Sequence, residues 1–359
     1  MLEAVARSLR ALAWWFGPFD PVPPPAPVPA ATVSRTQISS DILHLACAAD
    51  ANYAPHCAAM LNSVLDHAGG LAVTVHFMHA RHLDRDVLER LAVMISTKGG
   101  WFHPVHVPDE SVAGLHASER ITRVAWYRSL LPQLLPDIER VLYLDCDVLA
   151  VDCLRPLWET DLEGCYAAAV RNVFQPALAK RHLALGLPPD QPYFNSGVLL
   201  MNLALMRRDR CTEKILTHAR QHGAKLIWVD QDSVNYVLGT RCRLLHPRWN
   251  CQNSLFYWRH AGEAFAPGEV EEATRRPAIL HFEGPGLAKP WNPLCKHPWR
   301  AHYHFNLAQT PWACQAEAEI DWGSRLLRLL PMRVAPVLLD WAWRLRRRLG
   351  RAFRRHRLR

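Results

Sequence analysis

The alternation of short apolar runs with amphipathic segments constrains the fold of this chain more than any other feature. Apolar runs of strand length at 42–48, 71–78 and 102–107 are separated by helical patterns at 58–67 and 84–95. Such an alternation is typical of a mostly parallel sheet with helices on both faces. We therefore expect an α/β fold with a Rossmann-like mixed, mostly parallel sheet.

The same pattern continues in the second half of the chain. Helical patterns are expected at 122–135, 206–222 and 232–238, and strand-like runs at 140–149, 197–201 and 278–282. The folded body begins at Asp41 and closes near Trp312. The sequence thus predicts an N-terminal segment (1–40), one α/β domain (41–312) and a C-terminal tail (313–359).

The positive charge of the chain is concentrated at its C-terminus. The net charge is +9, but residues 325–359 hold twelve Arg and one acid, a net charge of +11, so the rest carries −2. Leu, Trp and Phe alternate with these arginines, which is typical of a helix lying in an anionic membrane interface. An Arg-rich tail can also bind a nucleic-acid backbone, but the interleaved Trp and Leu favour the membrane.

The apolar stretch in the N-terminal segment is too short and too interrupted to span a bilayer. Its apolar stretch at 2–16 is interrupted by Arg7 and Arg10, and a proline-rich run at 18–29 follows. It also lacks the residue order of a secretory signal. We expect an amphipathic helix and a stiff linker, and no integral membrane segment in the chain. The ten cysteines show no zinc-ligand spacing, which favours reduced thiols in a cytosolic protein.

The strongest local signal is Asp145-Cys146-Asp147, which follows the apolar run Val141–Leu144. Ligands of open α/β sheets bind outside the carboxyl ends of strands. A sharp turn there brings alternate carboxylates to one side, where they can share a divalent cation. Two solvated acids at a strand end are the alternative interpretation.

Three weaker signals lie at similar junctions. Asp50, Asn52 and Tyr53 follow the first strand, where they can hold a base and a ribose, although they are also good turn residues. Asn195-Ser196-Gly197 and Asp230-Gln231-Asp232 interrupt apolar stretches, and Asp232 is also a candidate helix N-cap. His281 at a strand end is a candidate metal ligand or a buried core residue, and Lys289 can meet a phosphate.

Together and in this order, the motifs resemble the family 8 glycosyltransferases, which include lipopolysaccharide galactosyl- and glucosyltransferases and, more distantly, glycogenin. The resemblance covers about Asp41 to Trp299. It rests on A-A-D-A-N-Y-A-P, W-Y-R, V-L-Y-L-D-C-D-V-L, Y-F-N-S-G-V-L-L-M-N-L, D-Q-D, H-F-E-G and K-P-W. It implies a GT-A fold, a UDP-sugar donor, and a retaining hexosyltransferase that depends on Mn²⁺ or, alternatively, Mg²⁺.

The resemblance also implies roles for single residues. Asp145, Asp147 and His281 match the metal ligands, with the side chain of Cys146 turned away from the metal. Contacts with the nucleotide are implied for Asp50, Asn52, Tyr53, Arg128 and Lys289. Positions around the transferred sugar are implied for Asn195, Asp230 and Gln231.

One departure from the family pattern concerns the glycine before Lys289. Family members usually place it three residues earlier, whereas Gly284 lies five residues earlier and Gly286 three. Two residues are therefore inserted after His281, and either glycine is a candidate for lining the diphosphate.

The resemblance leaves several alternatives open. The donor is UDP-galactose or UDP-glucose, and the acceptor is expected to be a lipid-linked saccharide such as the lipopolysaccharide core. A glycogenin-like glucosyltransferase and a catalytically silent, membrane-docked member are the alternative functions. We expect a cytoplasmic protein attached peripherally to the inner face of the cytoplasmic membrane, with nucleic acid not among its partners.

Overall fold

The structure is a computed structural model of the chain, and it describes residues 22–23, 41–117, 122–175, 178–284 and 286–314. The described residues divide into two compact units, each treated by itself below. The larger contains 41–283 and 306–314, and the smaller contains 22–23 and 284–305. The rest of the predicted N-terminal segment and all but the first residues of the predicted tail lie outside the described residues.

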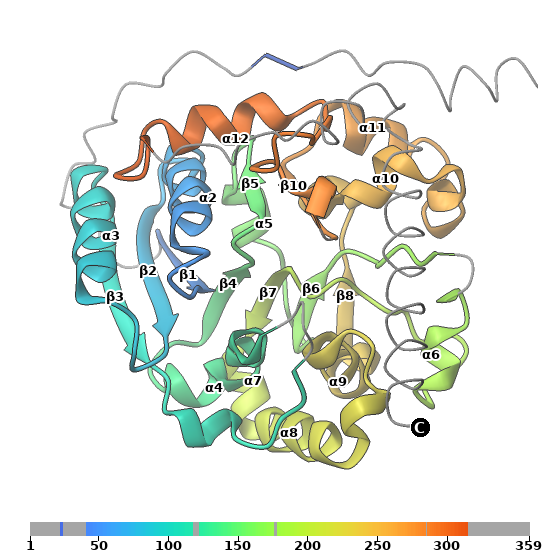
Figure 1. The fold of residues 1–359 in the computed structure, drawn as a ribbon. Helices are drawn as coiled ribbons and strands as arrows, with labels where there is room; N and C mark the ends of the chain where they lie inside the picture. The colour runs from blue at the N-terminus through green and yellow to red at the C-terminus, as the bar shows by residue number, and fades with distance from the viewer. Residues whose placement is uncertain (1–21, 24–40, 118–121, 176–177, 285, 315–359) are drawn as a thin grey trace, which may run out of the picture. The chain divides into compact units, whose positions relative to one another are not determined.

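The larger unit is built on a seven-stranded sheet of order β3-β2-β1-β4-β7-β6-β8 (Figure 1). Its strands are β1 (Ile42–Ala48), β2 (Ala72–His79), β3 (Trp101–His106), β4 (Arg140–Leu144), β6 (Ala167–Ala169), β7 (Val198–Asn202) and β8 (Cys242–Leu244). β1 pairs in parallel with β2 and β4, β2 with β3, and β6 with β8. β7 runs antiparallel to β4 and β6. The predicted mixed, mostly parallel sheet is therefore confirmed.

A second, three-stranded sheet was not predicted. It consists of β5 (Val148–Ala150), β9 (Cys251–Gln252) and β10 (Ile279–His281). β10 pairs antiparallel with β5 and parallel with β9. This small sheet joins the segment after β4 to two segments that lie more than a hundred residues later in the chain.

Helices cover both faces of the large sheet, as expected. The helices of the larger unit are α2 (Ala54–Asp66), α3 (Arg85–Thr97), α4 (Leu131–Leu134), α5 (Arg155–Trp158), α6 (Arg181–Ala184), α7 (Leu203–Arg208), α8 (Cys211–His222), α9 (Val229–Leu238), α10 (Asn253–Tyr257) and α11 (Glu269–Arg275). A further helix, α12 (Arg300–Leu307), includes residues of both units. α2 and α3 pack through one apolar cluster, and α4, α7, α8 and α9 through another.

The alternation of side chains along the strands explains the two clusters. In β4, Leu142 and Leu144 belong to the cluster under α2 and α3, whereas Val141 and Tyr143 belong to the cluster on the opposite face. All four are buried. A central strand that buries both faces in this way reads as a continuous apolar run.

Two segments that were predicted to form single helices each contain two helices instead. The segment 122–135 forms a 3₁₀ helix (Arg123–Leu130) followed by α4. Pro132 lies in the first turn of α4 and lacks the N–H that a continuous α-helix would need there. The segment 206–222 is divided into α7 and α8 at Arg210, whose φ of 53° is left-handed.

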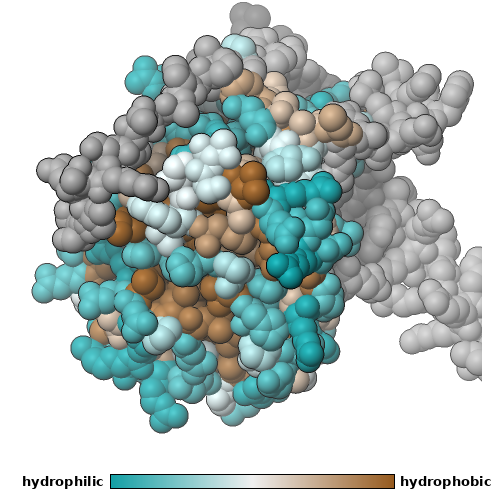
Figure 2. Space-filling view, turned by 90° about the vertical axis from the view of Figure 1, so that its left-hand side faces the viewer, coloured by the Kyte–Doolittle hydropathy of each residue, from teal (hydrophilic) through white to brown (hydrophobic). Residues whose placement is uncertain are grey.

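Strand β3 forms one edge of the large sheet. Figure 2 shows the side on which α3 and β3 lie in Figure 1, with apolar areas among polar ones. Exposed apolar side chains on these two elements include Val93 (64%) and Trp101 (44%). Pro104 within β3 lacks a donor, which hinders pairing with a further strand. In the part of the chain that the structure describes, no helix has the length and apolar character needed to cross a membrane.

Candidate active site

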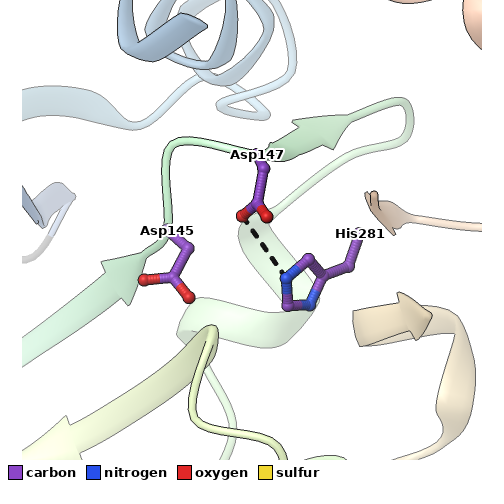
Figure 3. A group of neighbouring side chains, drawn as sticks. All are labelled: Asp145, Asp147 and His281. Carbon is purple, nitrogen blue, oxygen red and sulfur yellow. Dashed lines mark ion pairs between the residues drawn. The ribbon is translucent and has the colours of Figure 1, made fainter. Parts of the chain in front are cut away.

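Asp145, Asp147 and His281 converge at the junction of the two sheets (Figure 3). Asp145 follows β4, Asp147 immediately precedes β5, and His281 ends β10. One ligand atom from each lies within 4.8 Å of the others, which no other trio of His, Cys, Asp and Glu achieves among the described residues. The antiparallel pairing of β5 with β10 sets His281 opposite Val148 and so beside Asp147.

The turn between the two aspartates directs Cys146 the other way. Its side chain is 8% exposed, and its Sγ lies 3.1 Å from the carbonyl oxygen of Ala48. It belongs to the apolar cluster under α2 and α3. The side chain of Cys146 therefore points away from Asp145, Asp147 and His281, as expected.

These three side chains fit a divalent cation. The Nε2 of His281 lies 3.4 Å from Oδ1 of Asp147, longer than a normal N–H···O hydrogen bond. Two carboxylate oxygens and one imidazole nitrogen are ligands that suit Mn²⁺ and related ions. Without a cation or a proton, the oxygens and the nitrogen would face one another as acceptors.

Gly197 closes one side of the cluster. A Cβ at this position would lie 2.4 Å from Cε1 of His281 and 2.9 Å from Oδ2 of Asp145. Both distances are shorter than real carbon contacts allow, so any side chain here would displace His281 and Asp145. The backbone of Gly197 also accepts the N–H of Asp145 at 2.9 Å, which ties the end of β4 to the start of β7.

Arg128 connects Asp145, one of the three candidate metal ligands, to Asp230. Its Nη2 lies 2.9 Å from Oδ1 of Asp145, and its Nε lies 2.9 Å from Oδ2 of Asp230. The Nε–H points at the carbonyl oxygen of Ala125 (3.1 Å), so the contact with Asp230 is a charge pair without an aligned hydrogen bond. Arg128 is 5% exposed. Its predicted contact with the donor stays a prediction, because its shown contacts are with protein groups.

Tyr143 adds a further contact to Asp145. Its hydroxyl donates to Oδ1 of Asp145 at 2.9 Å, and its ring lies 4.6 Å below the guanidinium carbon of Arg128. Oδ1 of Asp145 thus receives bonds from two buried side chains. Its second oxygen, Oδ2, is the one that lies against Gly197 and the histidine.

Burial and charge act against each other on the ionisable groups of the site. Burial would lower the pKa of Arg128, but Asp145 and Asp230 outweigh it and raise the pKa. Burial raises the pKa of Asp230 to about 7, because Arg128 offsets only part of the desolvation. Burial also disfavours the charged form of His281, yet the Asp147 carboxylate raises the pKa of this histidine.

The segment Asp230-Gln231-Asp232 begins helix α9. Oε1 of Gln231 accepts the N–H of Ser196 at 2.9 Å. Ser196 directly precedes Gly197, so this bond holds Gln231 near the candidate metal ligands. Asp232 is fully buried and accepts the N–H groups of Ile227 and Trp228 before the helix, at 2.8 and 3.2 Å. The N-cap interpretation of Asp232 was wrong, because α9 begins at Val229 and its N-cap is Trp228. Asp232 is nevertheless structural, since it also forms a buried ion pair with Arg181.

Backbone strain lies directly before this segment. Val229 has a φ of 44°, a left-handed conformation that is unfavourable for a β-branched residue. It is fully buried, so packing holds it there. Strain of this kind concentrates at functional sites, and here it sets the direction in which Asp230 and Gln231 leave the turn.

Asn195 is buried within a network of amides. Its Oδ1 accepts the N–H of Gly197 at 3.0 Å and the Nδ2 of Asn250 at 2.9 Å. Its Nδ2 donates to Oδ1 of Asn172 at 3.2 Å. The contact with the transferred sugar implied for Asn195 stays a prediction.

Asp50, Asn52 and Tyr53 lie at the carboxyl end of β1. Because β1 pairs in parallel with β4, this end faces the same sheet edge as Asp145. Oδ1 of Asp50 accepts the N–H groups of Asn52 and Tyr53, both at 3.0 Å, so the turn interpretation is confirmed. The Tyr53 side chain is 39% exposed. The implied nucleotide contacts of these three residues stay predictions.

Gly284, Gly286 and Lys289 belong to the smaller unit. Lys289 donates its backbone N–H to Gly286 at 3.1 Å, and its Nζ lies 5.6 Å from the centre of the Trp291 ring. Both glycines are left-handed, with φ of 88° and 58°. The loop therefore requires both for its backbone, and their role toward a diphosphate stays a prediction.

Two residues of the site were not singled out from the sequence. Tyr143 interrupts an apolar strand with a hydroxyl group, and Asn250 lies between Trp249 and Cys251. A hydroxyl group within an apolar strand was the signal available for Tyr143, whereas the mixed stretch around Asn250 gave none.

Several known proteins are similar to this chain in sequence. General stress protein A of Bacillus subtilis is 29% identical over 277 residues, covering 76% of this chain and 95% of that protein. The lipopolysaccharide 1,3-galactosyltransferase of Salmonella typhimurium is 24% identical, covering 76% of this chain and 80% of the relative. The lipopolysaccharide 1,2-glucosyltransferase of Escherichia coli K12 is also 24% identical, covering 81% and 86%.

Solved structures share the fold. The galactosyltransferase LgtC, in complex with donor and acceptor sugar analogues, superposes with a TM-score of 0.68 at 24% identity. The match covers 80% of this chain and all of that one. The expected GT-A fold is thereby confirmed. The model of glycosyl transferase family 8 matches residues 44–295. Because this match spans well over half of the chain, the protein belongs to glycosyl transferase family 8.

Proposed function

We propose that this glycosyltransferase moves galactose or glucose from a UDP-sugar to a saccharide acceptor, with retention of the anomeric configuration. The observation that carries the proposal is the cluster of Asp145, Asp147 and His281 at the carboxyl end of β4. Two of the relatives are named galactosyl- and glucosyltransferases that act on lipopolysaccharide. These names support a hexose as the transferred group.

Asp145, Asp147 and His281 would hold Mn²⁺ or Mg²⁺. When bound there, the ion would neutralise charge on the diphosphate as it leaves. Arg128 supports this arrangement because it pairs with both Asp145 and Asp230 and offsets part of their negative charge. Lys289 is proposed to add a positive charge at the diphosphate, and Asp50, Asn52 and Tyr53 to hold the uridine.

We favour attack by the acceptor hydroxyl on the same face that the UDP leaves. Retaining glycosidases use a carboxylate nucleophile on the opposite face, but the matching residue here, Gln231, carries an amide. The bond between the anomeric carbon and the phosphate oxygen breaks, and the acceptor oxygen bonds to that carbon. The acceptor proton passes to the leaving phosphate oxygen. Gln231, held by Ser196, stabilises the positive charge that develops. Trapping of a sugar adduct on Gln231 or Asp230 would contradict this route.

The first experiment measures UDP release across a panel of UDP-sugars without acceptor. The assay runs once with Mn²⁺ and once with EDTA. Slow, metal-dependent hydrolysis of one UDP-hexose would support the proposal and name the donor. Absence of both UDP binding and UDP release in the presence of metal would favour the catalytically silent alternative.

Attachment to a membrane is a separate part of the proposal. The basic, aromatic composition of residues 324–359 supports binding to anionic lipids, and hence a lipid-linked acceptor at the inner face of the cytoplasmic membrane. Flotation with anionic liposomes, with and without these residues, tests it. Truncated protein that floats as well as the full chain would overturn the attachment.

A further inference from the structure

A chain of hydrogen bonds leads from a backbone amide to the histidine of the metal cluster. It starts at the N–H of Gly197, a group that can only donate. This N–H lies 3.0 Å from one end of the Asn195 side-chain amide. The atom of Asn195 at that end must therefore accept, which identifies it as the carbonyl oxygen Oδ1.

The same oxygen fixes the orientation of a second amide. Oδ1 of Asn195 also lies 2.9 Å from the side-chain amide of Asn250. Because Oδ1 cannot donate, the atom of Asn250 that faces it must be Nδ2. The other atom of this amide, the acceptor Oδ1, lies 2.9 Å from Nδ1 of His281.

We infer that Asn250 is a positioning residue that holds His281 in its Nδ1–H tautomer. Since Oδ1 of Asn250 can only accept, Nδ1 of His281 must carry a proton. The lone pair of Nε2 then faces Asp147 and the place of the cation. The inference rests on the proposed metal-dependent function, because a histidine binds a metal through an unprotonated nitrogen.

Burial makes this arrangement a firm one. Asn250 is fully buried, and Asn195 and His281 are each 5% exposed, so water does not offer ready replacements for these bonds. Reversal of the Asn195 amide would set its NH₂ against the N–H of Gly197, donor against donor. Reversal of the Asn250 amide would set its Oδ1 against Oδ1 of Asn195, acceptor against acceptor.

The backbone keeps Asn250 at this distance. It ends a short 3₁₀ helix (Pro247–Asn250) that leads directly into β9. β9 pairs with β10 so that Cys251 lies opposite Leu280, one residue before the histidine. The carbonyl of Arg248 also accepts the N–H of Ala278 at 2.9 Å. Asn250 and His281 are thus brought together by paired strands rather than by a mobile loop.

The tautomer can be measured without any metal. Long-range ¹H–¹⁵N NMR correlations of histidine-labelled, metal-free protein distinguish a ring protonated at Nδ1 from one protonated at Nε2. The spectrum is recorded in alkaline solution, where the ring is neutral, and the His281→Gln variant identifies the signal. We expect the Nδ1–H form. An Nε2–H ring at His281 in the wild-type protein would overturn the inference.

The consequence for the metal is tested with Asn250→Ala. Loss of a partner that orients a histidine ligand typically costs 10- to 100-fold in metal affinity. We expect the dissociation constant for Mn²⁺, measured by electron paramagnetic resonance of the free ion, to rise by about 10- to 100-fold. Affinities of the variant and the wild type within about threefold of each other, a difference of only about 0.6 kcal/mol, would contradict the role of Asn250.

Asn62→Ala is the matched control. Asn62 is also fully buried and bonds a second asparagine, since its Nδ2 lies 2.9 Å from Oδ1 of Asn306, but it is part of α2 and does not contact the cluster. The control should lose stability and keep its Mn²⁺ affinity. If the wild type itself fails to bind Mn²⁺, the proposed function fails, whereas the tautomer measurement still decides the orientation of His281.

Discussion

His281 and His76 are both buried histidines on strands, with exposed fractions of 5% and 6%, but their surroundings differ. His281 ends β10 against the carboxylates of the metal cluster. His76 lies in β2 between His44 of β1 and His103 of β3, which together form a histidine cluster. The Nδ1 of His44 is 3.1 Å from Nε2 of His76, and the rings of His76 and His103 stack 5.8 Å apart.

The pKa values of the two histidines move in opposite directions for this reason. Burial lowers the pKa of His76 to about 4, helped by the neighbouring imidazoles of His44 and His103. Burial acts the same way on His281, but the Asp147 carboxylate reverses the direction. Burial by itself therefore does not determine the charge of a histidine, and the partner groups decide it. A cation fits beside His281, whereas burial and the neighbouring imidazoles favour the neutral form of His76.

The largest expected effect comes from removing one of the three proposed metal ligands. Asp147→Ala removes one ligand and leaves Asp145 and His281 to hold the ion. We expect sugar transfer to fall on the order of 1000-fold, because charge on the leaving diphosphate is no longer neutralised. A transfer assay at saturating Mn²⁺ measures it. Asp161→Ala, at an exposed position, is the control, and full activity of the Asp147 variant would remove the metal role.

The next effect tests how closely Gly197 fits against the ligands. In Gly197→Ala, the added methyl group meets His281 and Asp145 at impossible distances. We expect a loss of about 2–3 kcal/mol in the free energy of unfolding, together with weaker Mn²⁺ binding. Urea unfolding and metal titration measure the two effects. Gly262→Ala, where a Cβ meets nothing within 4 Å, should change neither. Unchanged metal affinity in Gly197→Ala would disprove the close fit.

A smaller effect concerns the histidine cluster. The pKa of His76 is lower in the folded chain than in the unfolded chain, so acid protonates the unfolded state first and favours it. The contribution of His76 to stability is complete above pH 6.5 and is lost as the pH falls toward 4. Between pH 7 and 5 this loss is about 1–2 kcal/mol. His76→Gln should remove that part of the pH dependence. The free energy of unfolding, measured by chemical unfolding at several pH values, tests it, and an unchanged dependence on pH in the variant would refute it.

The smallest effect separates burial from repulsion within the same cluster. His103 is exposed, and its charge contributes to the lowered pKa of His44 and His76. His103→Gln should raise both pKa values slightly and change acid stability by less than about 0.5 kcal/mol, because an exposed charge is screened by water. NMR titration of the His44 and His76 rings measures it. A larger change than in His76→Gln would mean that repulsion outweighs burial.

The sequence by itself determined the elements whose information is local. Strands β1, β2 and β3 and helices α2 and α3 lie close to their predicted bounds, because their apolar period is contained in each short segment. The same holds for the turn at Asp145-Cys146-Asp147, since an apolar strand followed by two acids needs no distant partner to be recognised. The helix break at Arg210 was not predicted, because it depends on a left-handed residue within a helical pattern.

Only the tertiary structure decided how distant segments meet. It set the antiparallel direction of β7, the small sheet that brings His281 to Asp147, and the contact of Gly197 with two ligands. It also revealed Asn250, whose role depends on hydrogen bonds to Asn195 and His281, far away in sequence. Such pairings depend on which buried polar groups still need a hydrogen-bond partner once the core has formed. The periodicity of a short segment does not indicate these distant partners.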